Sequence, residues 1–226
     1  MPTVPVSLIG LVGVLVGAAI GASVWRARLC TFGAIEDALM GRDWRRAKVF
    51  GLALGVAMTL TQALVLANLF DPRLSTYVPD RLSLLPIGAG AMLFGFGMAL
   101  VGTCAFGSLV RLGGGDLRSL VVLILFGALA YAMQRGALAP LRIAALEFFA
   151  VPMPGASASS LGGMSRHFLG FDAGFAVAAL LASVTAYAVH ADVRLRRARR
   201  LTTAGVLLGL GVAAGWIVTQ VAIDRF

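Results

Sequence analysis

The sequence predicts an all-α, polytopic membrane protein, and three properties of its composition agree on this. Hydrophobic residues make up 59% of the 226 residues and charged residues only 13%, whereas a soluble domain carries about 25% charged residues. The mean hydropathy is +0.92. Long apolar stretches recur along the chain, and a helix satisfies its own backbone hydrogen bonds in hydrocarbon. These properties exclude a secreted disulfide scaffold, a disordered chain and an ordinary cytosolic enzyme.

Six apolar stretches are predicted to form membrane-spanning helices. A helix that crosses the hydrocarbon needs about 20 residues, within a range of about 17–25, and the fourth stretch is short by that measure. The first stretch lacks a basic segment before it and ends in Ser23-Val24-Trp25-Arg26, which is no small-x-small cleavage site, so we expect a span and not a signal peptide. The stretches are Leu8–Val24, Ala47–Leu69, Pro86–Gly102, Leu120–Met133, Ala173–Val189 and Ala204–Ala222.

Basic residues set the predicted orientation. The chain has 19 Lys and Arg against 10 Asp and Glu, a net charge of +9, and basic loops stay on the cytoplasmic side of a membrane. We therefore expect loops 26–48 and 191–200 to be cytoplasmic and the N-terminus to lie outside. No basic face is interleaved with aromatic residues, so nucleic-acid binding is not expected. The clusters contain Arg26, Arg28, Arg42, Arg45, Arg46 and Lys48, and the five arginines of Arg194–Arg200.

Residues 1–226 are predicted to form a single integral membrane domain. Residues 135–170 form an outer connection in which Leu141–Ala150 has the pattern of an interfacial helix and residues 151–160 read as an irregular connection. Residues 171–226 supply further spans. Four glycines on one face of the first span predict close helix packing: Gly10, Gly13, Gly17 and Gly21.

The two cysteines mark an internal repeat. Cys30-Thr-Phe-Gly-Ala34 and Cys104-Ala-Phe-Gly-Ser108 share the pattern Cys-x-Phe-Gly-small. Each follows an apolar span, and a glycine (Gly41 or Gly115), a charged segment and another span come after it. This order predicts a repeat over residues 7–69 and 86–134.

The segments after the cysteines are too short to cross a bilayer. Phe32–Met40 and Phe106–Leu112 would give helices only about 10–14 Å long. Short apolar segments at corresponding positions of a repeat indicate discontinuous, re-entrant half-helices around a central site. Each cysteine then stands at a half-helix N-terminus, where free N–H groups attract anions.

Three stretches around these motifs carry a family resemblance: Arg26–Asp37, Gly41–Arg46 and Gly102–Gly115. In them the sequence resembles the YeeE/YedE family of bacterial inner-membrane proteins, the sulphur-transport family that includes thiosulfate uptake proteins. The resemblance implies a helical transporter of the bacterial inner membrane whose short re-entrant helices meet at mid-membrane. Longer family members carry a further cysteine motif, and no third cysteine exists here.

The resemblance also implies a set of site residues. Cys30 and Cys104 are the expected thiol contacts of a sulphur-containing anion such as thiosulfate. A small cytosolic sulphur-carrier protein is the natural partner. The backbone N–H groups of both motifs would supply the positive helix ends, at Phe32, Gly33, Ala34, Phe106, Gly107 and Ser108.

Charged residues near the motifs have two interpretations. Four arginines could attract anions at the mouth of a pathway, although their role as determinants of topology explains them as well. Asp37 and Asp116 are expected to pair with arginines or cap helices, because a carboxylate would repel an anionic substrate. The arginines are Arg26, Arg28, Arg111 and Arg118.

No pattern in the sequence predicts a cofactor or a metal site. The two cysteines form neither a Cys-x-x-Cys pair nor a zinc pattern. Gly113-Gly-Gly-Asp116 lacks the Lys-Ser/Thr of a phosphate-binding loop and predicts a turn that ends a helix.

Three functions fit these patterns. The first is a transporter or channel for uptake of a sulphur-containing anion, most closely thiosulfate, through the two half-helices. The second is a membrane-embedded thiol enzyme, a sulphurtransferase or oxidoreductase, which needs a nucleophilic thiolate and usually a resolving partner or a base. The third is a membrane subunit that docks a cytosolic sulphur carrier on its basic loops. We favour the transporter over an enzyme.

Overall fold

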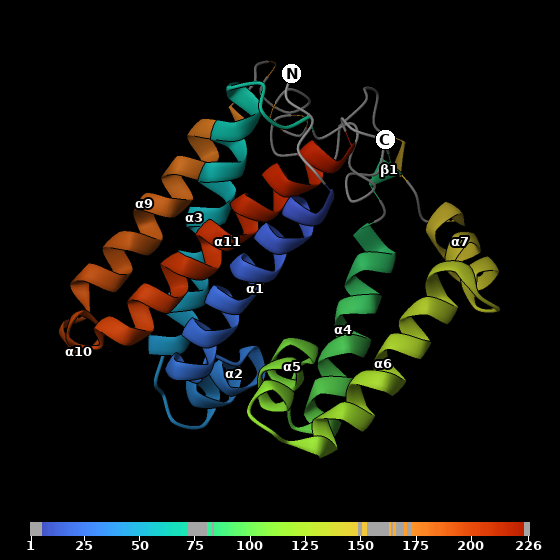
Figure 1. Ribbon diagram of the computed structural model, residues 1–226, viewed down its shortest axis with the longest axis horizontal. Helices are drawn as coiled ribbons and strands as arrows, with labels where there is room; N and C mark the ends of the chain where they lie inside the picture. Colours follow the sequence, from blue (N-terminus) through green and yellow to red (C-terminus); the bar gives the residue numbers. More distant parts are fainter. Residues whose placement is uncertain are drawn as a thin grey trace.

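The computed structural model describes residues 6–71, 81–82, 84–148, 151–152, 163, 165, 170 and 173–223. The fold is all-α, as predicted, apart from one pair of two-residue strands (Figure 1). The elements are α1 (Val6–Ala27), α2 (Thr31–Leu39), α3 (Arg45–Leu66), β1 (Arg81–Leu82), α4 (Leu84–Val101), α5 (Ala105–Gly113), α6 (Leu117–Arg135), α7 (Ala139–Phe148), β2 (Val151–Pro152), α9 (Gly174–Ala191), α10 (Val193–Arg197) and α11 (Arg199–Ile223).

The described part of the chain contains six helices long and apolar enough to cross a membrane, one for each predicted stretch. The protein is therefore a multi-pass membrane protein. The fourth of these helices, α6, is longer than its apolar stretch because polar residues form its ends. Asp116 accepts hydrogen bonds from the Arg118 N–H at 3.1 Å and from Ser119 Oγ at 3.1 Å, which caps the first turn.

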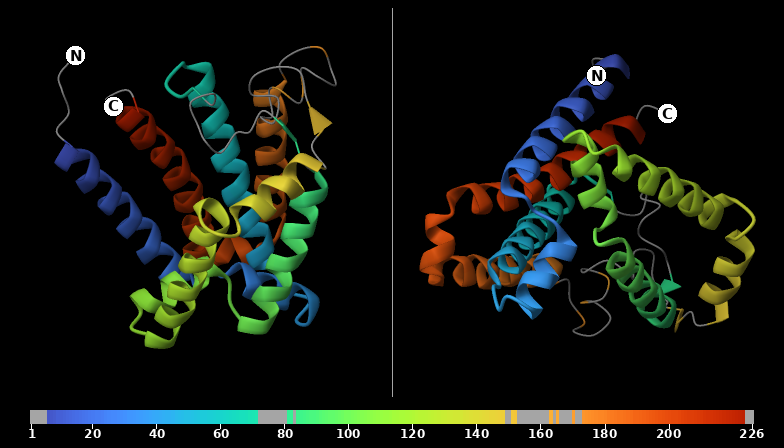
Figure 2. Two further views of the ribbon diagram at one scale, coloured as in Figure 1. Left: turned by 90° about the vertical axis from the view of Figure 1, so that its right-hand side faces the viewer. Right: turned by 90° about the horizontal axis from the view of Figure 1, so that it is seen from below.

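The long helices fall into two groups. In the first, α3 packs against α9 and α11, and α11 packs against α1; in the second, α6 packs against α5 and α7. The groups meet where α5 contacts α1 and α2. Above that junction α4 and α6 diverge from the first group (Figure 1), and the view from below in Figure 2 shows the same separation. Large apolar side chains of α4 are exposed, including Met92 and Leu93, as expected of a surface that faces hydrocarbon.

Glycines allow the closest helix approaches, but not at the predicted positions. A Cβ atom on Gly55 of α3 would lie 2.8 Å from Ala182 Cα of α9, and one on Gly209 of α11 would lie 2.7 Å from Ala53 O of α3. The prediction for the first span is wrong, since a Cβ at any of its four glycines would meet nothing within 4 Å. The close contact between α1 and α11 forms instead at Ile20, which faces Gly211.

The buried apolar core lies at the lower end of the bundle in Figure 1, where α1, α3, α9, α10 and α11 come together. Phe106 and Val110 of α5 pack against this core. The core therefore holds the second helix group to the first and fixes the position of α5. Its buried members are Val24, Leu29, Val49, Leu52, Val189, Leu195 and Ala204.

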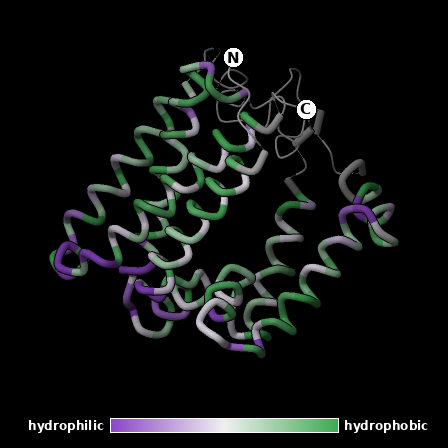
Figure 3. The backbone as a smooth tube through the Cα atoms, viewed as in Figure 1, coloured by the Kyte–Doolittle hydropathy of each residue, from purple (hydrophilic) through white to green (hydrophobic). Residues whose placement is uncertain are grey.

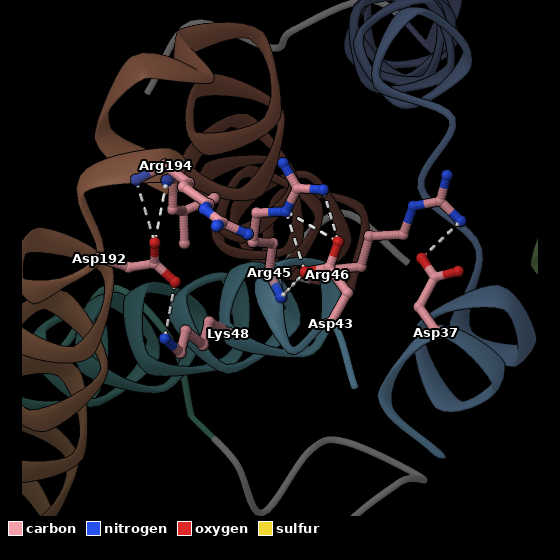
Figure 4. A network of polar contacts seen from close by, with 8 residues as sticks. Asp37, Asp43, Arg45, Arg46, Lys48, Asp192 and Arg194 are labelled. Carbon is pink, nitrogen blue, oxygen red and sulfur yellow. Dashed lines mark hydrogen bonds and ion pairs between the residues drawn. The ribbon is translucent and has the colours of Figure 1, made fainter. Parts of the chain in front are cut away.

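The two basic connections lie at this same end, where Figure 3 shows hydrophilic residues gathered. Lys48 Nζ of α3 binds Asp192 Oδ2 at 2.8 Å, and Asp192 also accepts hydrogen bonds from the N–H groups of Arg194 and Leu195 (Figure 4). Hydrogen bonds from Arg45 lower the pKa of Asp43 to about 2. Residues 26–48 and 191–200 thus lie on one side of the bundle, while the cytoplasmic identity of that side stays a prediction.

The connection after α6 contains one element that the sequence did not predict. The predicted interfacial helix Leu141–Ala150 corresponds to α7. Val151 and Pro152, expected in an irregular connection, instead form β2, which pairs antiparallel with β1. A pair of two-residue strands is too short to show the alternating hydrophobicity by which a strand is predicted. Most of the predicted irregular connection lies outside the described residues.

Candidate functional site

Each cysteine is the residue directly before a nine-residue helix. Cys30 and Cys104 have extended backbone conformations and occupy the N-cap positions of α2 and α5, and of the two side chains only that of Cys104 accepts a capping hydrogen bond. Two residues before each cysteine the chain reverses through a positive φ, 50° at Arg28 and 71° at Gly102. The Leu29 N–H binds Val24 O at 3.2 Å, which closes the end of α1. The short helices coincide with the predicted segments to within one residue, and their re-entry into a membrane stays a prediction.

The two cysteine thiols lie together although they are far apart in sequence. Cys30 Sγ is 3.9 Å from Cys104 Sγ. Cys104 is buried and Cys30 is half-buried. The Gly107 N–H donates to Cys104 Sγ at 3.2 Å. The N-terminal ends of α2 and α5 therefore converge on one pair of sulphur atoms.

The glycine of the second motif makes this convergence possible. A Cβ atom at position 107 would lie 2.7 Å from Thr103 Oγ1, 2.9 Å from Cys30 Sγ and 3.5 Å from Cys104 Sγ. No side chain fits in that space without displacing a thiol. At the matching position of the first motif, a Cβ on Gly33 would lie 3.1 Å from Arg46 Nη1 and 3.7 Å from Cys30 Cβ.

Some of the other motif residues line the cavity beside the thiols, and others hold the short helices in place. Phe32 faces the same cavity as Cys30, whereas Phe106 packs against the core. The N–H groups of Ala34 and Ser108 bind the carbonyls of Cys30 and Cys104, each at 2.9 Å. They close the first helical turn, and the Gly107 N–H is also occupied because it donates to Cys104 Sγ. The other N–H groups of the two first turns are therefore the ones positioned for an anion. Ser108 is fully buried and its hydroxyl has no hydrogen-bond partner among the described residues.

A cavity of about 1160 Å³ opens beside the thiols at the end of the bundle that carries the basic connections. Cys30, Gly33 and Gly107 line it, and Cys104 lies behind them. Two carboxylates, Glu36 and Asp116, also face it. Its charge is dominated by five arginines: Arg26, Arg28, Arg46, Arg111 and Arg200.

Three of these arginines were predicted at the mouth, and Arg46 and Arg200 were missed. Arg46 lies in a stretch that carries the family resemblance. Because it is one of six basic residues in the loop 26–48, on the sequence alone it is interpreted as a determinant of membrane orientation. Arg200 begins the last span, about 170 residues after Cys30 in the sequence, and only the packing of α11 against α1 brings it to the cavity. The fourth predicted residue, Arg118, is not among the lining residues.

Mild oxidation should join the two thiols without unfolding the protein. Treatment with diamide is expected to form a Cys30–Cys104 disulfide, because the sulphur atoms start 3.9 Å apart; the two thiols lose two electrons and two protons, and diamide is reduced to its hydrazine. Loss of two alkylatable thiols from the intact chain, measured by mass spectrometry, would show the bond. A Cys30→Ser variant should keep one free thiol. Two freely alkylated thiols after oxidation of the folded chain would contradict the observed geometry.

Comparison with known proteins finds a matching family model and a named relative. A family model described as sulphur transport matches residues 26–224. The thiosulfate transporter TsuA of Spirochaeta thermophila is 32% identical over 125 residues, which cover 55% of this chain and 36% of that protein. The match therefore extends over about a third of the length of that relative.

Proposed function

The chain belongs to the sulphur transport family, and from this premise we propose that it carries a sulphur-containing anion, thiosulfate or a close analogue, across the bacterial inner membrane into the cytoplasm. It would do so as a transporter or channel and not as an enzyme. The name of the 32% identical relative, a thiosulfate transporter, supports the choice of anion. The observation that carries the proposal is the thiol pair at two helix N-termini beside an arginine-lined cavity.

The chemistry of the thiol pair suits a dianion that must be released again. An anion in hydrocarbon without compensation faces a large desolvation cost. The N-terminal ends of α2 and α5 lower that cost with partial charges, each equivalent to about half an elementary charge. A neutral thiol adds a weak S–H donor, which matches the soft terminal sulphur of thiosulfate. Because these contacts are individually weak, the anion can leave them.

The order of groups along the site defines a direction. Cys104 is buried, Cys30 lines the cavity, and the five arginines surround the cavity. With loops 26–48 and 191–200 cytoplasmic, an anion from outside would meet Cys104 first, then Cys30, and would reach the cytoplasm past the arginines. The small cytosolic sulphur carrier implied by the family resemblance would receive it at these basic connections.

Uptake of labelled thiosulfate into proteoliposomes tests the proposal. Replacing either thiol, in Cys30→Ala or Cys104→Ala, should lower the uptake rate about tenfold, the value of one hydrogen bond at the upper end of its range. The control is Met92→Ala, which removes a sulphur atom from an exposed position on α4 and should leave uptake unchanged. Unchanged uptake in folded Cys104→Ala would refute a role for the thiols, and no uptake by the unaltered chain would refute the proposed function.

The thiol pair also supports one alternative, a membrane-embedded thiol oxidoreductase or sulphurtransferase. An oxidoreductase of this kind usually resolves its covalent intermediate with a second thiol, and Cys104 is 3.9 Å from Cys30. Turnover distinguishes the two functions. An enzyme would consume a sulphur donor in detergent, where no compartments exist, whereas a transporter would change only the location of thiosulfate.

A further inference from the structure

One of the cavity arginines, Arg46, is held directly beside the thiol site. A Cβ built on Gly33, in the first turn of α2, would lie 3.1 Å from Arg46 Nη1 and 3.7 Å from Cys30 Cβ. The guanidinium group therefore packs against the helix turn that follows Cys30. Its backbone belongs to the first turn of α3, so it approaches from a different helix than the thiol.

A carboxylate fixes this arginine in place. Arg46 Nη1 lies 3.1 Å from Asp37 Oδ2 of α2, and both side chains remain about one-third exposed (33% and 38%). Figure 4 shows the two side chains reaching toward each other from separate helices. A guanidinium has five N–H donors in a fixed fork, and its Nη1 atom makes the contact to Asp37. The N–H groups of the fork that point away from Asp37 can serve an oxyanion.

We propose that Arg46 is the residue that receives the anion beside Cys30, with Asp37 as its positioning partner, and that this pair makes the cavity selective for anions over neutral sulphur compounds. This inference rests on the proposed function and deepens it. The oxygen atoms of the anion would meet the guanidinium while its terminal sulphur meets the Cys30 thiol. Asp37 offsets part of the arginine charge, so the anion is attracted without being bound too tightly to leave.

Thiol modification tests this role without requiring transport. In a Cys104→Ala background Cys30 is the only thiol of the chain. Its thiolate attacks the sulfenyl sulphur of a methanethiosulfonate reagent, so that a disulfide forms, the S–SO₂ bond breaks and methanesulfinate leaves. The measured quantity is the rate with the anionic ethylsulfonate reagent divided by the rate with the neutral methyl reagent. A substitution that changes the reactivity of the thiol, or its accessibility to both reagents, changes both rates equally and cancels in this ratio.

Arg46→Gln should lower the ratio about fivefold or more, because charge that lines a cleft raises the local concentration of anions by tenfold or more in favourable cases. Arg46→Lys keeps the charge and should stay within about twofold of the unaltered ratio. The matched control is Arg45→Gln. Arg45 is the adjacent cation, it pairs with Asp43, and it is absent from the cavity lining, so this ratio should not change.

The outcomes separate the inference from the proposed function. An unchanged ratio in Arg46→Gln, or an equal fall in Arg45→Gln, would overturn the role of Arg46 even if the protein transports thiosulfate. A fall confined to Arg46→Gln supports that role even if thiosulfate uptake fails, in which case the proposed function alone is refuted. Where uptake occurs, Arg46→Gln should raise the KM for thiosulfate more than it lowers the maximal rate.

Discussion

Gly107→Ala is expected to abolish thiosulfate uptake while the protein remains folded. The added methyl group would lie 2.7 Å from Thr103 Oγ1 and 2.9 Å from Cys30 Sγ, which is closer than Cβ atoms approach other heavy atoms. The two thiols must then separate, or α5 must shift away from α2. A displacement of about 1 Å at a site of this kind can cost about a hundredfold in rate. Initial uptake rates in proteoliposomes measure the loss.

Two further alanine variants serve as controls for this prediction. Gly113→Ala lies at the end of the same helix, where a Cβ would meet nothing within 4 Å, so uptake should be retained. Gly33→Ala should have an intermediate effect, because its nearest neighbour is the end of the flexible Arg46 side chain. Gly107→Ala should also prevent the diamide cross-link. Normal uptake together with normal cross-linking in this variant would show that the close approach of the two motifs is not needed.

Gly209→Ala should destabilise the first helix group. A Cβ at this position of α11 would lie 2.7 Å from Ala53 O and 2.8 Å from Val56 Cβ of α3, and neither of these atoms can move without the backbone of α3. Overpacking of this kind costs about 1–3 kcal/mol, against which the better helix propensity of alanine returns about 1 kcal/mol or less. We expect the apparent Tm in detergent to fall by about 5 °C.

The control for this second prediction is Gly215→Ala on the same helix. A Cβ there meets nothing within 4 Å, so the substitution should leave the apparent Tm unchanged or raise it slightly. Tryptophan fluorescence during heating can follow both variants. If Gly209→Ala melted at the same temperature as Gly215→Ala, the tight contact between α11 and α3 would contribute nothing to stability.

Hydropathy and local motifs were enough to predict the membrane-spanning helices and the two short helices after the cysteines, but not α10 or the contacts between helices. Every predicted span corresponds to a helix, and both nine-residue helices begin where the cysteine motifs placed them, because these features depend on neighbouring residues. The four glycines of the first span led to a wrong prediction of close packing. Their spacing shows which face of the helix lacks side chains, but not whether another helix packs against that face. The packing glycines are those of α3 and α11, whose partners lie more than a hundred residues away in the sequence.

For the candidate site, the sequence could predict which residue types to consider but not how they lie together. The repeated Cys-x-Phe-Gly pattern identified Cys30 and Cys104, but their separation of 3.9 Å depends on how α5 packs against α1 and α2. Arg46 could be noticed only as one basic residue among several. Its position against Gly33 arises because α3 packs alongside α2. The distribution of charges along the sequence does not show which helices pack together.

The thiols belong to different helix groups, and this has a mechanical consequence. Cys30 follows α1 in the group of α1, α3, α9 and α11, whereas Cys104 follows α4 and precedes α5 in the other group. The groups touch mainly where α5 meets α1 and α2. A displacement that moved α5 away from α2 would therefore increase the distance between the two sulphur atoms. If the pathway opened by such a displacement, the Cys30–Cys104 contact would break in the same movement.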